Sequence, residues 1–191
     1  MFIDYLAVML INLVAGLFLL AYYIYRGIDD SDQKRWSPGF AITGIIGFAT
    51  GLHMVLTWPL PGPYNIAFGD TELLFGVLFL AASLALALNW SLFSVSIYAL
   101  FAGFIAIEVG ARIINKSLTT EPLVAGIGFI LTGLTGVFLA PALYWLKARP
   151  FRIIFVIIAI VAALIWAFVG YDAYWTHFVS FARWVPATLK K

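Results

Sequence analysis

Residues 151–170 read FRIIFVIIAIVAALIWAFVG, and Arg152 near the start is the one charged side chain among them. A helix of about 20 apolar residues is long enough to cross the roughly 30 Å hydrocarbon core of a bilayer. Several other runs of this kind follow one another along the chain, separated by short polar segments. The sequence therefore predicts an all-α fold, a polytopic membrane bundle of transmembrane helices.

The composition of the whole chain indicates the same class. Of its 191 residues, 64% are hydrophobic and 10% are charged, whereas soluble domains carry about 25% charged residues. The alternating segments of about 10 residues that are typical of a membrane β-barrel are absent. The chain has no cysteine, which excludes disulfides and cysteine-ligated metals. Its net charge of +2, with dispersed basic residues, excludes a nucleic-acid surface.

Proline, glycine and charged residues set the boundaries of the predicted helices, which form one transmembrane domain over residues 1–191. Aromatic residues in the tail recur at spacings of three and four, which predicts an amphipathic helix in the membrane interface. Pro141 is expected to kink the fifth span. The predicted spans are 3–25, 38–57, 71–88, 92–112, 122–146 and 151–170, and the predicted interfacial helix is 171–186.

Consecutive spans alternate in direction, so the segments between them divide between two sides of the membrane. Side A receives both termini and the segments after the second and fourth spans, and side B receives the other three segments. The basic residues closest to the spans gather on side B. The positive-inside rule therefore predicts a plasma-membrane protein whose side B is cytoplasmic and whose termini are both extracytoplasmic.

Most acidic residues and both histidines fall on side A. Ionisable groups close to hydrocarbon usually face the interior of a bundle and are candidates for function. Imidazole titrates near neutral pH and binds metals readily, so the histidine on the second span is part of this group. The candidates for binding a ligand or a proton are His53, Glu72, Glu108, Arg112 and Asn115, with Tyr64 and Asn65 as a lid.

Structural roles compete with these functional ones. Asp70 at the start of the third span is expected to cap that helix. Glu108 and Arg112 are four residues apart, the spacing of an intrahelical ion pair. Asn12 in the first span is expected to hydrogen-bond to a neighbouring helix, and His53 is equally explained as a satisfied interfacial side chain.

Small residues predict close helix packing at two places. Thr43, Gly47, Thr50, His53 and Thr57 lie within one side of the second span, and the fifth span carries LTGLTG at residues 131–136. Glycine and threonine let helix backbones approach closely and supply hydrogen bonds between helices. Both stretches are therefore interpreted as seams between helices.

A metal site is a further alternative. Mixed imidazole and carboxylate ligands suit zinc, iron or manganese, and His53, Asp70, Glu72 and Glu108 are the available set. No spacing among them is diagnostic, and no catalytic motif is present. A haem between the two histidines is disfavoured, because His177 lies on the tail helix.

Several stretches carry a resemblance that covers nearly the whole chain. They include GLHMVLTWPLPGPYNIAFGD at 51–70, ARIINKSLTTEPL at 111–123, GFILTGLTG at 128–136 and the closing WVPATLK. Together they resemble an uncharacterised family of archaeal and bacterial multi-pass membrane proteins of unknown function. The resemblance implies a prokaryotic membrane protein and transfers no substrate, cofactor or catalytic residue.

The leading hypothesis is binding or transport of a small solute, proton or cation at a polar site near the outer leaflet. The second is an accessory or scaffolding subunit that docks a membrane-protein partner or a second copy of the chain. A membrane-embedded metal-dependent enzyme is the third, and a non-enzymatic role is favoured over it. The lipid bilayer is the partner that the composition predicts directly.

Overall fold

The computed structural model of the chain describes residues 4–145 and 149–185, and all regular elements within these ranges are helical. Residues 3, 146 and 186, where three predicted helices begin or end, lie outside the described residues. The π-helical segments Asn65–Asp70 and Pro141–Trp145 precede α3 and follow α5. The α-helices are α1 (Tyr5–Tyr25), α2 (Ser37–Thr57), α3 (Thr71–Ala87), α4 (Phe93–Lys116), α5 (Pro122–Val137) and α6 (Arg149–Ser180).

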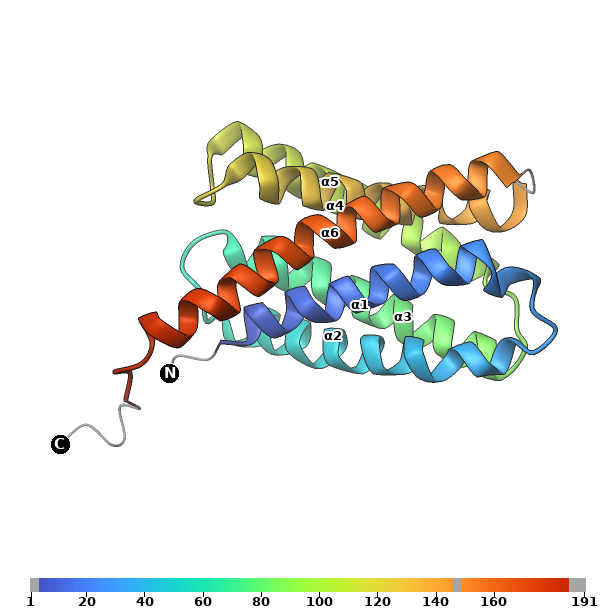
Figure 1. Cartoon of the computed structure of the whole chain (residues 1–191), viewed down its shortest axis with the longest axis horizontal. Helices are drawn as coiled ribbons and strands as arrows, with labels where there is room; N and C mark the ends of the chain where they lie inside the picture. The colour runs from blue at the N-terminus through green and yellow to red at the C-terminus, as the bar shows by residue number, and fades with distance from the viewer. Residues whose placement is uncertain (1–3, 146–148, 186–191) are drawn as a thin grey trace.

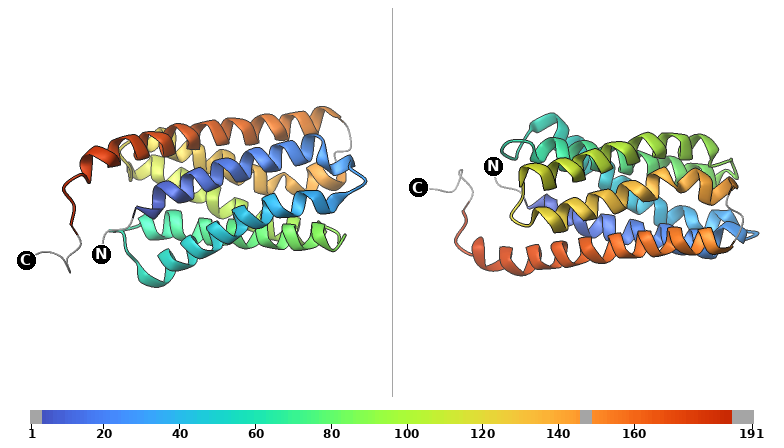
Figure 2. Two further views of the ribbon diagram at one scale, coloured as in Figure 1. Left: turned by 60° about the horizontal axis from the view of Figure 1, so that its bottom comes forward. Right: turned by 90° about the horizontal axis from the view of Figure 1, so that it is seen from above.

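The helices lie side by side in an elongated bundle (Figures 1 and 2). α1 packs between α2 and α6, α2 packs on α3, and α4 packs on α5. The ends of α1 and α6 nearest the termini lie at the same end of the bundle as the loops that join α2 to α3 and α4 to α5 (Figure 1). This end corresponds to the predicted side A.

The outer surface of the bundle is apolar. Leu56, Phe101 and Phe168 are exposed at 74%, 63% and 63% of their surface, although contiguous apolar patches are rare on soluble monomers. Within residues 4–145 and 149–185, five helices are long and apolar enough to cross a membrane, and α5 is a shorter apolar helix. The chain therefore has the architecture of a multi-pass membrane protein.

Glycines bring two pairs of helices into backbone contact. A Cβ on Gly51 would lie 2.4 Å from the backbone N of Leu73, so α2 and α3 meet here with no room for a side chain. A Cβ on Gly133 of α5 would lie 2.5 Å from the carbonyl oxygen of Gly103 on α4. The close packing predicted at Gly47 and along LTGLTG is thus confirmed, whereas the exposed His53 and Thr57 do not belong to the seam between α2 and α3.

The predicted fifth span is divided. α5 ends at Val137, and a π-helical segment follows from Pro141 to Trp145. Proline has no N–H, and its ring clashes with the carbonyl four residues earlier, which is the carbonyl of Val137. Pro141 therefore accounts for the end of α5 and the change to a π-helical segment.

The third helical segment begins earlier than predicted. Asp70 has helical φ and ψ of −65° and −43° and makes no side-chain capping bond, so its prediction as an N-cap is wrong. Asn65 organises the start instead: its Oδ1 accepts from the backbone N–H of Leu60 at 3.0 Å. The Thr71 hydroxyl donates to the Ala67 carbonyl at 2.6 Å, which satisfies an acceptor within the irregular turn.

The prediction of a separate helix over 171–186 is wrong at its boundary, because α6 continues without a break to Ser180. Gly170 was expected to end the sixth span. It instead packs on α1, where a Cβ would lie 3.0 Å from Ile11 Cδ1, and no proline lies between Gly170 and Ser180 to stop the helix. The last turns carry exposed aromatic side chains, with Trp175 and Phe178 exposed at 82% and 81%.

An ion pair fixes the loop after α1 to the start of α6. Both Nη atoms of Arg152 donate to the Asp29 carboxylate, with 3.2 Å between Nη2 and Oδ1. These hydrogen bonds lower the pKa of Asp29 from its usual value of 3.8. Asp29 is largely exposed, so solvent screens the interaction.

We expect Asp29→Asn to lower the melting temperature slightly near neutral pH. An exposed ion pair contributes about 0.2–1 kcal/mol. Because the folded pKa is lowered, this stability is present above pH 3.8 and is lost as the pH falls through the folded value. Thermal unfolding in detergent measures the change in melting temperature near neutral pH and well below pH 3.8. Asp172→Asn, at another exposed carboxylate, is the control. If the melting temperature of Asp29→Asn is still lowered at the acid pH, the loss does not come from the ion pair between Asp29 and Arg152.

Candidate functional site

Glu72 is the ionisable candidate that the structure places inside the bundle. Its side chain is 8% exposed and lies between α1, α2 and α3. The helical segment begins at Asn65, so Glu72 lies about 10 Å along the axis from its start, at 1.5 Å per residue. Glu72 is therefore deeper in the bundle than a helix starting at Thr71 would place it.

Asn12 of α1 lies beside this carboxyl group. Its Nδ2 donates to the Thr43 carbonyl of α2 at 2.9 Å and lies 3.4 Å from Glu72 Oε1. The predicted hydrogen bond between Asn12 and a neighbouring helix is confirmed. Nδ2 has two N–H groups, which donate to the Thr43 carbonyl and to Glu72 Oε1, and the amide oxygen remains as an acceptor. Within the described part of the chain, no donor reaches Asn12 Oδ1 or Glu72 Oε2.

Glycines make room for the carboxyl group. A Cβ on Gly47 would lie 3.0 Å from Glu72 Oε1 and 3.1 Å from the Cα of Gly76. Gly76 itself packs directly on the backbone of α2. The close approach of α2 and α3 therefore brings Glu72 against the helix that carries Thr43.

The surroundings of Glu72 are unfavourable for an unpaired negative charge. An ionised carboxylate in an apolar environment is costly unless it is paired. The ion pairs found among residues 4–145 and 149–185 all lie elsewhere in the bundle. A proton, or a cation from outside the chain, would neutralise the site.

Both histidines lie near the start of α1, outside the Glu72 site. His53 is exposed; its ring meets Tyr5 edge-on at 5.4 Å between centroids, and its Nδ1 lies 3.5 Å from the Thr57 hydroxyl. His177 Nδ1 lies 2.9 Å from Asp4 Oδ2, which joins the end of α6 to the start of α1. The interfacial explanation of His53 therefore fits its position.

The polar group at the end of α4 also lies outside this site. The side chains of Glu108, Arg112 and Asn115 are exposed. Glu108 and Arg112 both belong to the described residues, yet no ion pair joins them, so that prediction is wrong. Buried neighbours two residues away, Ala106 and Gly110, occupy the packed face of α4.

The structure does not assemble the proposed metal ligands. Within residues 4–145 and 149–185, no group of three or more His, Asp or Glu side chains could hold a metal ion. Of the proposed set, Glu72 is buried, Asp70 is half-buried, and His53 and Glu108 are exposed. A metal site built from these four residues is not supported.

Tyr64 and Asn65, the predicted lid, hydrogen-bond to the backbone of loops. Their polar groups are therefore used within the fold and do not face the Glu72 site. Asn65 is fully buried, and its amide bonds the backbone of Leu60. The Tyr64 hydroxyl donates to the Leu118 carbonyl at 2.6 Å, and its ring stacks on Phe68. The loop before α3 is therefore fixed to the loop after α4.

The site partners of Glu72 were assigned only structural roles from the sequence. Asn12 was predicted as an isolated buried polar residue, and Thr43 as part of a packing strip. A usable signal was present nonetheless: Glu72 lies four residues before Gly76, on the face of α3 that packs closely. Helical spacing from a packing glycine would have separated Glu72 from the exposed candidates.

Comparisons with known proteins give a family and no activity. Neither a search of curated proteins nor a search of solved structures finds a match to the chain. A family model described as "Protein of unknown function (DUF981)" matches residues 1–180. This match spans nearly the whole chain and confirms the resemblance to an uncharacterised family, so the chain belongs to that family.

Proposed function

We propose that the protein binds a proton or a small monovalent cation inside the membrane, at Glu72 and Asn12. The observation that carries the proposal is the buried Glu72 carboxyl, which has no cationic partner among the described residues. Two oxygen atoms, Glu72 Oε2 and Asn12 Oδ1, remain as acceptors. One carboxylate balances one positive charge, whereas calcium sites use six to eight oxygen ligands.

The proposal includes six crossings, with the Glu72 site in the half of the bilayer nearer side A. α5 and the segment Pro141–Trp145 together are long enough for the crossing that α5 alone is too short to make. The exposed aromatic residues of α6 fit a location in the membrane interface. The basic residues near side B support a cytoplasmic location for that side.

Infrared difference spectroscopy tests the site directly. We expect purified protein in detergent to show the C=O stretching band of a protonated carboxyl, which decreases on raising the pH or on adding sodium or potassium chloride. Glu72→Gln should remove this signal, because glutamine keeps the size and hydrogen bonds of the side chain and cannot titrate. Glu108→Gln, at an exposed glutamate, is the matched control and should leave the signal unchanged.

Two results would contradict the proposal. One is a titrating band that is the same in the wild type and Glu72→Gln. The other is the absence of any difference between the spectra of the wild type and Glu72→Gln across pH and both salts. An accessory subunit without a binding site at Glu72 predicts this second result, provided that Glu72→Gln folds and assembles normally.

A further inference from the structure

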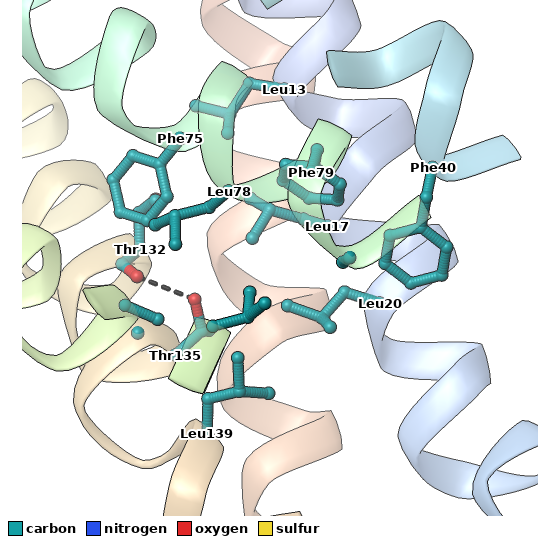
Figure 3. Close-up of a pocket in the computed structure, with 14 residues that line it drawn as sticks. Leu13, Leu17, Leu20, Phe40, Phe75, Leu78, Phe79, Thr132, Thr135 and Leu139 are labelled. Carbon is teal, nitrogen blue, oxygen red and sulfur yellow. Dashed lines mark hydrogen bonds between the residues drawn. The ribbon is translucent and has the colours of Figure 1, made fainter. Parts of the chain in front are cut away.

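An apolar cavity lies next to the Glu72 site, between α1, α3, α4 and α5 (Figure 3). Leu13, Phe75 and Phe79 line both the cavity and the Glu72 site. The volume of the cavity is about 50 Å³. The buried carboxyl and the apolar cavity are therefore neighbours with a shared wall.

The cavity extends away from Glu72 along two helices. Its lining residues run from Leu13 to Leu20 on α1 and from Phe75 to Ala82 on α3. Seven residues of helix correspond to about 10 Å, at 1.5 Å per residue. The cavity is therefore an elongated slot with Glu72 at one end and its other end toward side B.

The polar atoms along the slot are already satisfied. The Thr132 hydroxyl donates to the Gly128 carbonyl at 2.8 Å and accepts from Trp166 Nε1 at 2.8 Å. The Thr135 hydroxyl donates to the Thr132 carbonyl at 2.6 Å (Figure 3). The other lining side chains are apolar. The slot itself thus suits an apolar occupant, and the free acceptors lie at its Glu72 end.

Polar groups reappear beyond the slot on side B. One helical turn further toward side B, a second cavity is lined by Tyr23 of α1, Leu86 of α3 and Leu143 of the segment Pro141–Trp145. Asp30 and Asn89 also line it. The three spaces follow one another along the same helices, from acceptor site to apolar slot to mixed polar cavity.

We propose that the ligand of the Glu72 site is an amphiphile with an ammonium head group and an alkyl chain. The inference rests on the proposed function, because it places the ammonium group at Glu72 as the bound cation. An ammonium donates hydrogen bonds and carries the charge opposite to the carboxylate, which matches the acceptors Glu72 Oε2 and Asn12 Oδ1. The alkyl chain fills the slot bounded by Leu13, Phe75 and Phe79.

Binding of labelled decylamine tests the inference, with decanol as the neutral amphiphile of equal chain length. The protein is reconstituted in phosphatidylcholine nanodiscs, and empty nanodiscs correct for partitioning into lipid. We expect saturable binding of decylamine and about tenfold weaker binding of decanol, since each tenfold corresponds to the loss of roughly one charge-assisted hydrogen bond. Glu72→Gln should reduce decylamine binding to the level of decanol.

Ala82→Phe tests the slot separately from the head-group site. Ala82 lines the slot and lies ten residues from Glu72, about 15 Å along α3. The added ring should weaken binding of both amphiphiles by about tenfold or more. Ala81→Phe, at the neighbouring half-buried position outside the cavity lining, is the matched control. Val95→Phe fills the slot from α4 and replaces Ala82→Phe if that variant does not fold.

The outcomes separate this inference from the proposed function. If decylamine binding is not saturable, or is unchanged in the slot variants, the proposal of an amphiphilic ligand is wrong. A titrating Glu72 band would then still support the proton or cation site. If the wild type binds decylamine and decanol equally in the slot, and Glu72→Gln binds decylamine as well as the wild type does, the ammonium group is not recognised at Glu72. The slot then holds only an alkyl chain. If the infrared signal is absent and decylamine does not bind, both proposals fail.

Discussion

A Gly76→Ala variant is expected to unfold at a markedly lower temperature than the wild type. The added Cβ would lie 2.3 Å from the backbone N of Phe48 and 2.5 Å from the carbonyl carbon of Gly47. Backbone atoms of a helix cannot turn aside as a side chain can, so α2 and α3 must separate. Overpacking of this kind costs about 1–3 kcal/mol and occasionally more. We expect a loss at the upper end of this range.

Gly39→Ala is the matched control for this substitution. Its added Cβ would meet only the side chain of Leu19, with the nearest atom at 2.9 Å, and that side chain can change rotamer. Alanine also favours the helix over glycine by about 1 kcal/mol. Thermal unfolding in detergent, followed by tryptophan fluorescence, compares the two variants. Equal melting temperatures for Gly76→Ala and Gly39→Ala would contradict close packing of α2 on α3.

Separation of these helices should also affect the Glu72 site. Gly76 and Gly47 both line the space around the carboxyl group. We therefore expect the carboxyl band of Glu72 to shift in folded Gly76→Ala protein and to remain unchanged in Gly39→Ala. The seam and the site would then be physically linked, because the same contact brings Glu72 against α2.

Trp166→Ala is the second substitution with a large expected effect. Trp166 is 1% exposed, and its indole joins α6 to α5 by the hydrogen bond to Thr132. Its ring meets Phe129 edge-on at 5.1 Å between centroids. Replacing a buried Trp with Ala costs about 3–5 kcal/mol in soluble cores. We expect about 3 kcal/mol here, because lipid is as apolar as the core and the loss is mainly one of packing.

Trp175→Ala is the control, because Trp175 lies on the same helix and is 82% exposed. It should change the melting temperature little. Trp166→Phe should fall between the two variants, since it retains most of the ring packing and leaves the Thr132 hydroxyl without its donor. Unfolding in detergent measures all three. If Trp166→Ala is as stable as Trp175→Ala, Trp166 does not hold α6 on α5.

Features along the helix axes were largely accessible from the sequence. Apolar run length predicted the helices, and the charged and proline-rich segments marked their ends. Pro141 predicted the break after Val137, since its effect on the preceding turn is local. The continuation of α6 past Gly170 was missed because glycine alone does not stop a helix that packs against a neighbour.

The rotation of each helix about its axis decided which polar residues meet. A helix turns by about 100° per residue, so His53 lies about 200° from the packing glycine Gly51. Glu108 is likewise two residues from Gly110, and both side chains are exposed. Glu72 is four residues from Gly76, which returns it to within about 40° of the packed face. The ionisable candidates His53, Glu72, Glu108 and Arg112 share an end of the bundle, and of these described residues only Glu72 is buried.

The sequence by itself determined that the chain is a bundle of apolar helices and placed most of its acidic residues and both histidines near one end. These properties follow from composition and from backbone chemistry over a few residues. Only the tertiary structure decided that Glu72 meets Asn12 and Thr43, and that an apolar slot begins beside them. Those contacts join residues as much as 60 positions apart. They depend on which faces of α1, α2 and α3 pack together, and that choice is set by the shapes of all three helices at once.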